Sequence, residues 1–221
     1  MKAKMMFVLA TFGIGFNLSA QDKTQGKVNY EVSINLHASL KPDQLQFKDM
    51  IPEFSTSEEV LYFKGNLAKI ERVSPGEQEG EDGVKIKMEF EGGKKGMYSD
   101  GTFEGTYNLL EKDGKKSLQV MNSKIGKKEN RDEKEGSKEN QRTKTKEILG
   151  FTCQSVAAGD VTMWITKELP FKIGPFGIFS KEGAILGLDM KTGKAYATSI
   201  DYVPVKAEEL VVPKDLPIEK K

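Results

Sequence analysis

The sequence predicts a mainly β protein built on an antiparallel sheet, with one or two short helices. The prediction rests on strict alternation in two segments, on many short candidate strands separated by turns, and on scarce helical periodicity. The alternating segments are 27–36 and 84–91. Each has one apolar and one polar or charged face, as a strand exposed to water on one side requires. Such half-buried strands belong to antiparallel rather than doubly wound sheets.

Further segments have the composition of short strands, and recognisable turns join several of them. Asp113-Gly114 lies between two such segments and is a strong hairpin signal. Gly65-Asn66, Gly159-Asp160 and Thr192-Gly193 are further turn candidates. Many short strands spaced by turns fit a sandwich, a barrel or a curved half-barrel. The segments are 59–64, 67–73, 97–99, 103–111, 116–122, 143–149, 151–157, 160–167, 184–190 and 195–203.

Helix is expected at two places. Residues 42–51 have apolar side chains at roughly helical spacing, and Pro42 suits the first turn of a helix. Residues 207–211 are long enough for one more turn.

Residues 1–20 have the three parts of a cleaved secretory signal peptide. Lys2 and Lys4 form a positive start, residues 5–16 are mostly apolar, and Ala20 ends a stretch suited to cleavage. The apolar run of about a dozen residues is too short to cross a bilayer core of ~30 Å. The alternative is a buried N-terminal helix. We therefore expect an exported, periplasmic protein whose mature chain lacks a transmembrane segment.

The mature chain, residues 21–221, has the length of a single β domain. Removal of residues 1–20 takes away two lysines and no acid, which leaves 32 basic and 33 acidic side chains and a formal net charge of −1. That balance gives no long-range attraction to nucleic acid, so we expect no nucleic-acid partner. Two stretches, 74–83 and about 123–147, are too polar to bury much surface, and we expect the second to be a charged, mobile loop.

The inventory of reactive residues argues against catalysis. The chain has one histidine, His37, and one cysteine, Cys153, too few for the usual zinc ligand sets. His37 lies on the polar face of the first predicted strand, and no nucleophile elbow supports a catalytic triad. Cys153 is interpreted as a small buried hydrophobe. We expect no catalytic residues, no bound metal, no cofactor and no enzymatic activity.

The segment 169–179 is unusual because it combines the prolines and glycines of a loop with large apolar side chains. One interpretation is ordinary core that closes one end of the sheet. The other is an apolar lid over a cavity that accepts an acyl chain or similar ligand, with Trp164 lining the same space. The candidate ligand-binding residues are Trp164, Leu169, Phe171, Ile173, Phe176 and Phe179.

The C-terminal half resembles the GLPGLI family, or a sister family, of exported envelope proteins of Gram-negative bacteria. The resemblance rests on an Ile-x-Gly-aromatic-x-Cys strand at 148–153, a Trp-x-Thr-x-Glu-x-Pro strand at 164–170, and Gly174-Pro175 before the apolar strand 183–188; residues 59–71 also fit. The resemblance implies a single, strongly curved antiparallel sheet, a half-barrel like that of periplasmic lipoprotein carriers. It implies no particular activity.

These observations favour a non-catalytic function. We expect a binder or carrier of an apolar or lipid-linked molecule in the cell envelope. The alternative is a structural module that docks onto another envelope protein through exposed strand edges. An enzyme that uses carboxylates or Cys153 ranks third.

Overall fold

The computed structural model describes residues 22–73, 78–79, 85–86, 94–121 and 144–219. The predicted signal peptide lies outside these residues. So do the predicted loop over 123–143, most of 74–83, and the predicted strand 84–91 apart from Lys85–Ile86. The remaining part of the predicted mobile loop, 144–147, is described, and its last three residues belong to the strand Thr145–Ile148, so the loop prediction is wrong there.

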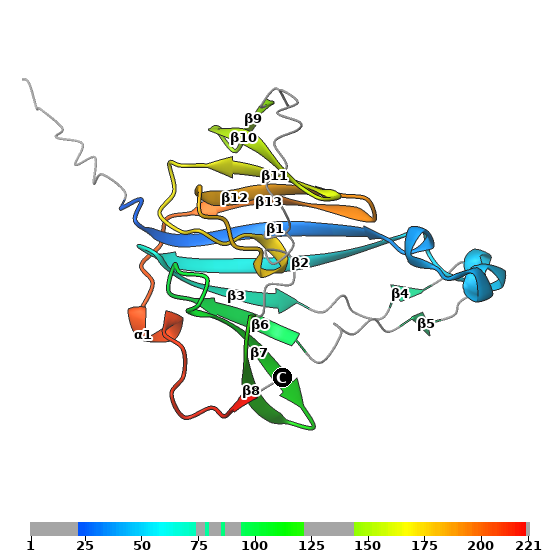
Figure 1. Cartoon of the computed structure of the whole chain (residues 1–221), viewed down its shortest axis with the longest axis horizontal. Coiled ribbons are helices and arrows are strands. Elements are labelled where there is room, and N and C mark those ends of the chain that lie inside the picture. The colour runs from blue at the N-terminus through cyan, green and yellow to red at the C-terminus, as the bar shows by residue number, and fades with distance from the viewer. Residues whose placement is uncertain (1–21, 74–77, 80–84, 87–93, 122–143, 220–221) are drawn as a thin grey trace, which may run out of the picture.

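The described residues form a mainly β structure, as the alternation predicts. Twelve strands make one open sheet in the order β14-β8-β7-β6-β3-β2-β1-β13-β12-β11-β10-β9 (Figure 1). Every neighbouring pair is antiparallel except β14 with β8, which is parallel. The twelve strands are β1 (Gln25–Asn35), β2 (Phe54–Lys64), β3 (Leu67–Val73), β6 (Lys94–Ser99), β7 (Thr106–Lys112), β8 (Lys115–Val120), β9 (Thr145–Ile148), β10 (Phe151–Ala158), β11 (Val161–Thr166), β12 (Ala184–Met190), β13 (Gly193–Asp201) and β14 (Ile218–Glu219).

Two short strands, β4 (Gln78–Glu79) and β5 (Lys85–Ile86), pair separately with each other. The helical content is small, and both expected helical segments are present. One is the 3-10 helix η2 (Pro42–Met50), and the other is α1 (Ala207–Leu210), the one α-helix among the described residues. Two further 3-10 turns are η1 (His37–Ser39) and η5 (Pro175–Gly177). None of the helices in the described residues has the length and apolar character needed to cross a membrane.

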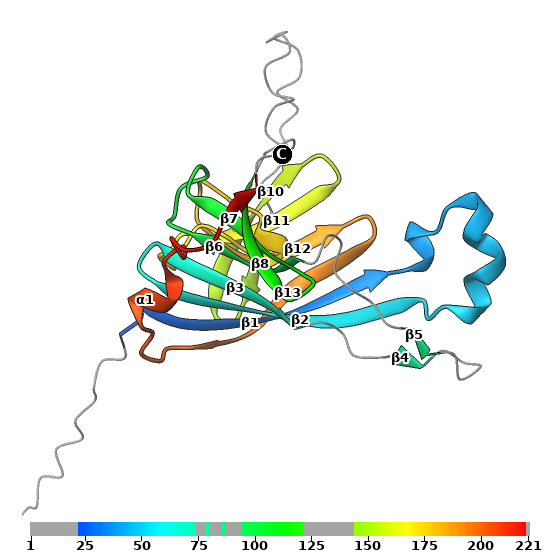
Figure 2. The same cartoon turned by 90° about the horizontal axis from the view of Figure 1, so that it is seen from below.

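The turn signals correspond to hairpin connections. Asp113 and Gly114 both have positive φ, 52° and 73°, and they join β7 to β8. A two-residue turn with positive φ at both positions matches the right-handed twist of the flanking strands. The long hairpin β1–β2 ends instead in η1 and η2. Figure 2 shows this helical tip projecting away from the rest of the sheet, and η2 has no buried residue.

Alternation along the strands gives the sheet two distinct faces. Val28, Tyr30 and Val32 on β1 share one face, called here the core face, with Leu61 and Phe63 on β2. The face that carries the intervening residues is called the opposite face. Directly paired residues of neighbouring strands share a face, so the pairing of the strands assigns side chains across the whole sheet.

The connection between β11 and β12, residues 167–183, covers the core face. The ring of Phe171 lies 5.0 Å from that of Phe63 on β2, measured between centroids. Gly174 packs directly against Ile185 on β12, and Gly177 against Met97 on β6, because a side chain at either glycine would collide with those residues. The connection therefore spans the core face from β12 to β6.

The C-terminal segment covers part of the opposite face. The helix α1 contacts β2 and β3, and Leu210 at its end is fully buried. The chain then returns along the sheet to β14, where the Leu118 amide donates a hydrogen bond of 2.8 Å to the Pro217 carbonyl. The connection 167–183 and the C-terminal segment thus cover the core face and part of the opposite face of the twelve-stranded sheet.

Candidate functional site

The three innermost predicted ligand-binding residues belong to the hydrophobic core. Leu169, Phe171 and Ile173 are all buried and form one cluster with Tyr30, Leu61 and other side chains of the core face. This is the placement that the core interpretation of 169–179 predicts. The lid interpretation stays a prediction, and neither of the two cavities described below is lined by a residue of 169–179.

Phe176 and Phe179 are only partly buried and lie at the tip of the same connection. Phe179 makes an edge contact with Phe103, with ring centroids 6.1 Å apart. Phe176 has a positive φ of 58° within η5, and its amide donates a 2.8 Å hydrogen bond to Glu59 on β2. Glu59 is itself buried and accepts a 2.8 Å bond from Arg72. A buried ion pair therefore anchors the tip of the connection.

Trp164 belongs to the same hydrophobic cluster as Leu169, Phe171 and Ile173. It pairs with Gly187 on β12, and Gly187 pairs with Tyr196 on β13, so all three residues lie on the opposite face. Phe171 packs on the core face against Phe63. Trp164 thus joins this cluster from the opposite face, and neither cavity described below is lined by Trp164 or by a residue of 169–179.

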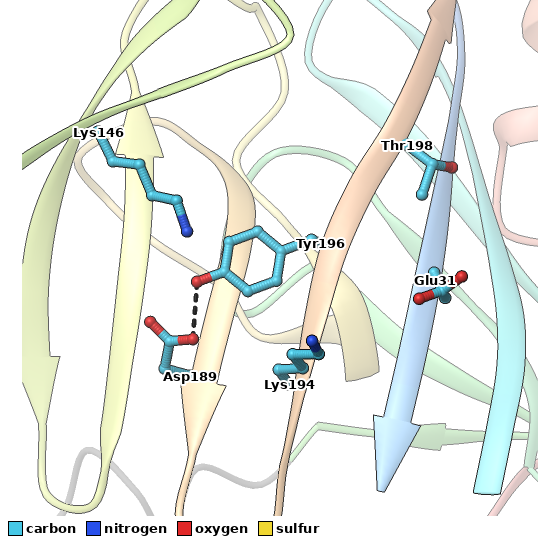
Figure 3. Close-up of a pocket in the computed structure, with 6 residues that line it drawn as sticks. All are labelled: Glu31, Lys146, Asp189, Lys194, Tyr196 and Thr198. Atoms are coloured by element: carbon cyan, nitrogen blue, oxygen red, sulfur yellow. Dashed lines mark hydrogen bonds between the residues drawn. The ribbon is translucent and has the colours of Figure 1, made fainter.

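The indole of Trp164 also belongs to a polar cluster centred on Asp189 of β12. The Trp164 Nε1–H donates a 2.7 Å hydrogen bond to Asp189 Oδ2, and the Tyr196 hydroxyl donates a 2.6 Å bond to Oδ1 (Figure 3 shows the second). Burial and this bond to a carboxylate raise the pKa of Tyr196 well above its usual value, so the hydroxyl stays protonated. The two donors fix the orientation of the carboxylate.

Gly187 is required for this arrangement. A β-carbon at position 187 would lie 2.6 Å from Tyr196 Cε1 and 2.9 Å from Cδ1. The tyrosine ring therefore rests directly on the backbone of β12, between Trp164 and its own strand. Any side chain at this position would displace the ring and the hydroxyl that bonds Asp189.

Lys146 reaches the cluster from β9, which is four strands away from β13 in the sheet order. Its ammonium lies 4.1 Å from the centroid of the Tyr196 ring and 5.4 Å from that of Trp164. On a flat sheet, β9 and β13 would be roughly 19 Å apart. Ile148 of β9 also comes within 3.2 Å of the β-carbon position of Gly187. This end of the sheet is therefore bent toward the opposite face.

The cluster borders a cavity of about 380 Å³ that opens to solvent, called here the polar pocket. Its other walls carry the exposed side chains of Glu31 on β1 and of Lys194 and Thr198 on β13, all drawn in Figure 3. Two lysines and two carboxylates give it a formal charge of zero. The residues that line it are Glu31, Lys146, Asp189, Lys194, Tyr196 and Thr198.

A second cavity, of about 470 Å³, lies between the sheet and the C-terminal segment and is called here the apolar groove. Its floor is the opposite face of β3, β7 and β8, and its cover is the chain from α1 to β14. Most of the lining side chains are aliphatic. The lining residues are Leu67, Ser99, Asp100, Gly105, Tyr107, Leu118, Leu210, Val211, Val212, Pro213, Lys214, Leu216 and Ile218.

The two reactive side chains of the sequence lie in settings that serve structure. His37 Nε2 is 2.7 Å from the carbonyl oxygen of Ile51, across the base of the helical hairpin tip. Cys153 is fully buried, and burial raises the pKa of its thiol to about 11. Among the described residues, no group of three His, Cys, Asp or Glu side chains is placed to hold a metal ion.

Comparison with known proteins gives little guidance. The chain matches no protein-family model and no curated protein. Among solved structures, PNGF-II in space group C2 is similar at a TM-score of 0.49 and 12% identity, over 88% of this chain and 31% of that one. The chain thus spans less than a third of that neighbour's length. A likeness of this size supports no statement about activity.

Sequence reasoning missed both cavities. The polar pocket combines residues from β1, β9, β12 and β13, and no local pattern shows that β9 bends over β13. One signal was available: Gly187 interrupts an otherwise apolar strand, and an isolated glycine in a strand often marks a close approach. The apolar groove depends on the path of residues 211–217, which have no regular periodicity.

Proposed function

We propose that this protein is a non-catalytic carrier of an apolar or lipid-linked molecule in the cell envelope, and that the apolar groove holds the ligand. The observation that carries the proposal is the groove itself, about 470 Å³ in volume with mostly aliphatic walls. Small-molecule sites are typically clefts of roughly 300–1,000 Å³ with apolar walls and a few polar groups. Here Ser99, Asp100 and Lys214 supply the polar groups.

Three further observations support the proposal. In the described residues, the apolar cover of the groove pairs with β8 through the two residues of β14 and the adjoining Pro217 carbonyl, so it can open with little loss of sheet structure. The signal-peptide pattern of residues 1–20 supports export to the periplasm. The bend at β9 supports the finer description of the sheet as a strongly curved, carrier-like half-barrel.

The test is binding of a fluorescent fatty acid, dansyl-undecanoic acid, to purified residues 21–221. We expect saturable binding, and we expect Leu216→Asp and Val212→Asp to weaken it at least about 10-fold, because each places a charge against the apolar chain. The matched control is Val203→Asp, at an exposed valine outside the groove, which should leave the affinity unchanged.

Two results would overturn the proposal. One is absence of fatty-acid binding by the unmodified protein. The other is equal affinity of all three aspartate variants, which would place the bound probe outside the groove. Circular dichroism of each variant establishes that the sheet is intact.

A further inference from the structure

We infer that the polar pocket is a second binding site, and that its ligand is a neutral, hydroxyl-rich ring, a saccharide unit. The inference is independent of the apolar groove, because the two cavities share no lining residue. It rests on the fixed acceptor at Asp189, on the donors around it, and on the neutral charge of the pocket.

The carboxylate of Asp189 is held in a fixed orientation by the protein itself. Each oxygen of the Asp189 carboxylate receives one hydrogen bond from within the protein, from Trp164 and from Tyr196. A carboxylate offers about four lone-pair positions, so each oxygen can accept a further bond from a ligand in the cavity. Because its orientation is already fixed, binding costs little side-chain entropy at this residue. Vicinal hydroxyls of a sugar ring are suitable donors to such a carboxylate.

Donors and acceptors alternate around the remaining wall. Lys194 and Thr198 lie on β13 on either side of Tyr196, and Glu31 lies directly across from Tyr196 on β1. A sugar hydroxyl both donates and accepts, so it can use an ammonium and a carboxylate at the same time. A pocket with both kinds of group matches a polyol better than a ligand that only donates or only accepts.

The charges argue against the other ligand classes. A ligand cation would compete with Lys146, whose ammonium already occupies the face of the Tyr196 ring. A phosphate or carboxylate would be attracted by two lysines and repelled by Glu31 and Asp189 in the same pocket. A neutral ligand meets neither penalty. The volume, about 380 Å³, is near the lower end for small-molecule sites and suits a single ring.

The chain has one tryptophan, and its indole donates a hydrogen bond to Asp189 of the pocket, so its fluorescence responds to changes at that carboxylate. We would titrate the mature protein with glucose and N-acetylglucosamine, and in parallel with glucuronate, glucosamine and inorganic phosphate. We expect a saturable change in Trp164 fluorescence with at least one neutral sugar, at a Kd on the order of 1 mM. The charged probes should bind more weakly or not at all.

Variants then locate the site, with affinities measured by calorimetry because Asp189 itself influences the fluorescence. We expect Asp189→Asn and Tyr196→Phe each to weaken binding of the neutral sugar at least about 5-fold, the effect of one lost hydrogen bond to a charged group. Lys194→Met, at an exposed position on the rim, provides a variant with little risk to folding and should also weaken binding. The matched control is Asp113→Asn in the β7–β8 turn.

The outcomes separate cleanly. Neutral-sugar binding that is lost in the pocket variants and kept in Asp113→Asn supports the inference. Binding of phosphate or glucuronate alone overturns it in favour of an anion site. No response to either neutral sugar, or equal weakening by Asp113→Asn, overturns it as well. The groove variants Leu216→Asp and Val212→Asp should leave sugar binding unchanged, so a failure here is distinguishable from a failure of the carrier proposal.

Discussion

At the scale of single residues, Leu149 has a backbone conformation that its residue type does not indicate. Leu149 and Gly150 both have positive φ, 52° and 81°, and join β9 to β10 in a tight turn. Turns of this kind favour Asn-Gly or Asp-Gly, because a leucine in the left-handed region costs roughly 1–2 kcal/mol. The sequence therefore predicts the Asp113-Gly114 turn clearly, whereas at the second turn it indicates only a break at Gly150 and places Leu149 at the end of the predicted strand 143–149. The pairing of β9 with β10 forces the turn despite its composition.

Cys153 gives a prediction about reactivity. Burial raises the pKa of its thiol to about 11, so at pH 8 the reactive thiolate is scarce. We expect iodoacetamide to modify the folded protein on the order of 100-fold more slowly than the protein unfolded in urea, where the pKa returns to about 8.5. Mass spectrometry of timed samples measures both rates. Equal rates would show that position 153 is open to solvent.

The same shift has a consequence for stability. Between pH 9 and pH 11 the unfolded chain releases the thiol proton and the folded chain retains it. The contribution of Cys153 to the free energy of unfolding is therefore fully present below about pH 8.5 and decreases as the pH rises toward 11. A Cys153→Ala variant lacks this pH dependence. The difference in the free energy of unfolding between the two proteins, measured from about pH 8.5 to pH 11, therefore isolates the effect of the thiol.

At the scale of elements, the 167–183 connection depends on one buried acid. Glu59 holds Arg72 through Oε1 and the amide of Phe176 through Oε2, both at 2.8 Å. We expect Glu59→Ala to lower the free energy of unfolding by about 3–5 kcal/mol, because it leaves a buried guanidinium without its carboxylate. Urea denaturation followed by circular dichroism measures the change.

The neighbouring acid supplies the control for that experiment. Glu58 is on the same strand but faces solvent, so Glu58→Ala should change the free energy of unfolding by no more than about 0.5 kcal/mol. A similar effect of both variants would mean that strand propensity, rather than the ion pair, is responsible.

The elements also show where alternation succeeds and where it fails. It predicts β1 well, because Val28, Tyr30 and Val32 are apolar and buried. It misses the first half of β2, where the buried positions are Ser55 and Glu59 and no apolar alternation exists to detect. In β12, Ile185 and Leu186 are both buried because a bulge opposite β11 disturbs the alternation. Irregular pairing of this kind depends on neighbouring strands, which a single segment does not reveal.

At the scale of the whole molecule, the mainly β class was predictable and the position of the binding cavities was not. Composition and alternation determine which faces are apolar. They do not determine that β1 pairs with β13, or that β9 bends over β12. Lys146, Asp189 and Tyr196 come from three strands, and only the completed sheet brings them together.

The C-terminal cover gives a prediction about the molecule as a unit. Leu210 is 1% exposed, whereas its neighbour Val211 is 46% exposed. If the cover is part of the cooperative fold, Leu210→Ala should lower the free energy of unfolding by about 2–5 kcal/mol, and Val211→Ala by less than about 1 kcal/mol. Urea denaturation of both variants checks this. A small effect at Leu210 would mean that the cover unfolds separately from the sheet.

The position of β1 has a consequence for the order of assembly. It is near the N-terminus, yet it lies in the middle of the sheet between β2 and β13, where Lys27 pairs with Asp201. During synthesis β1 can pair at once with β2, but its other edge has no partner until almost the whole chain exists. Closing so long a loop makes folding slow. Until then an unpaired strand edge is available to other chains, so the nascent protein is most exposed to aggregation just before residues 193–201 emerge.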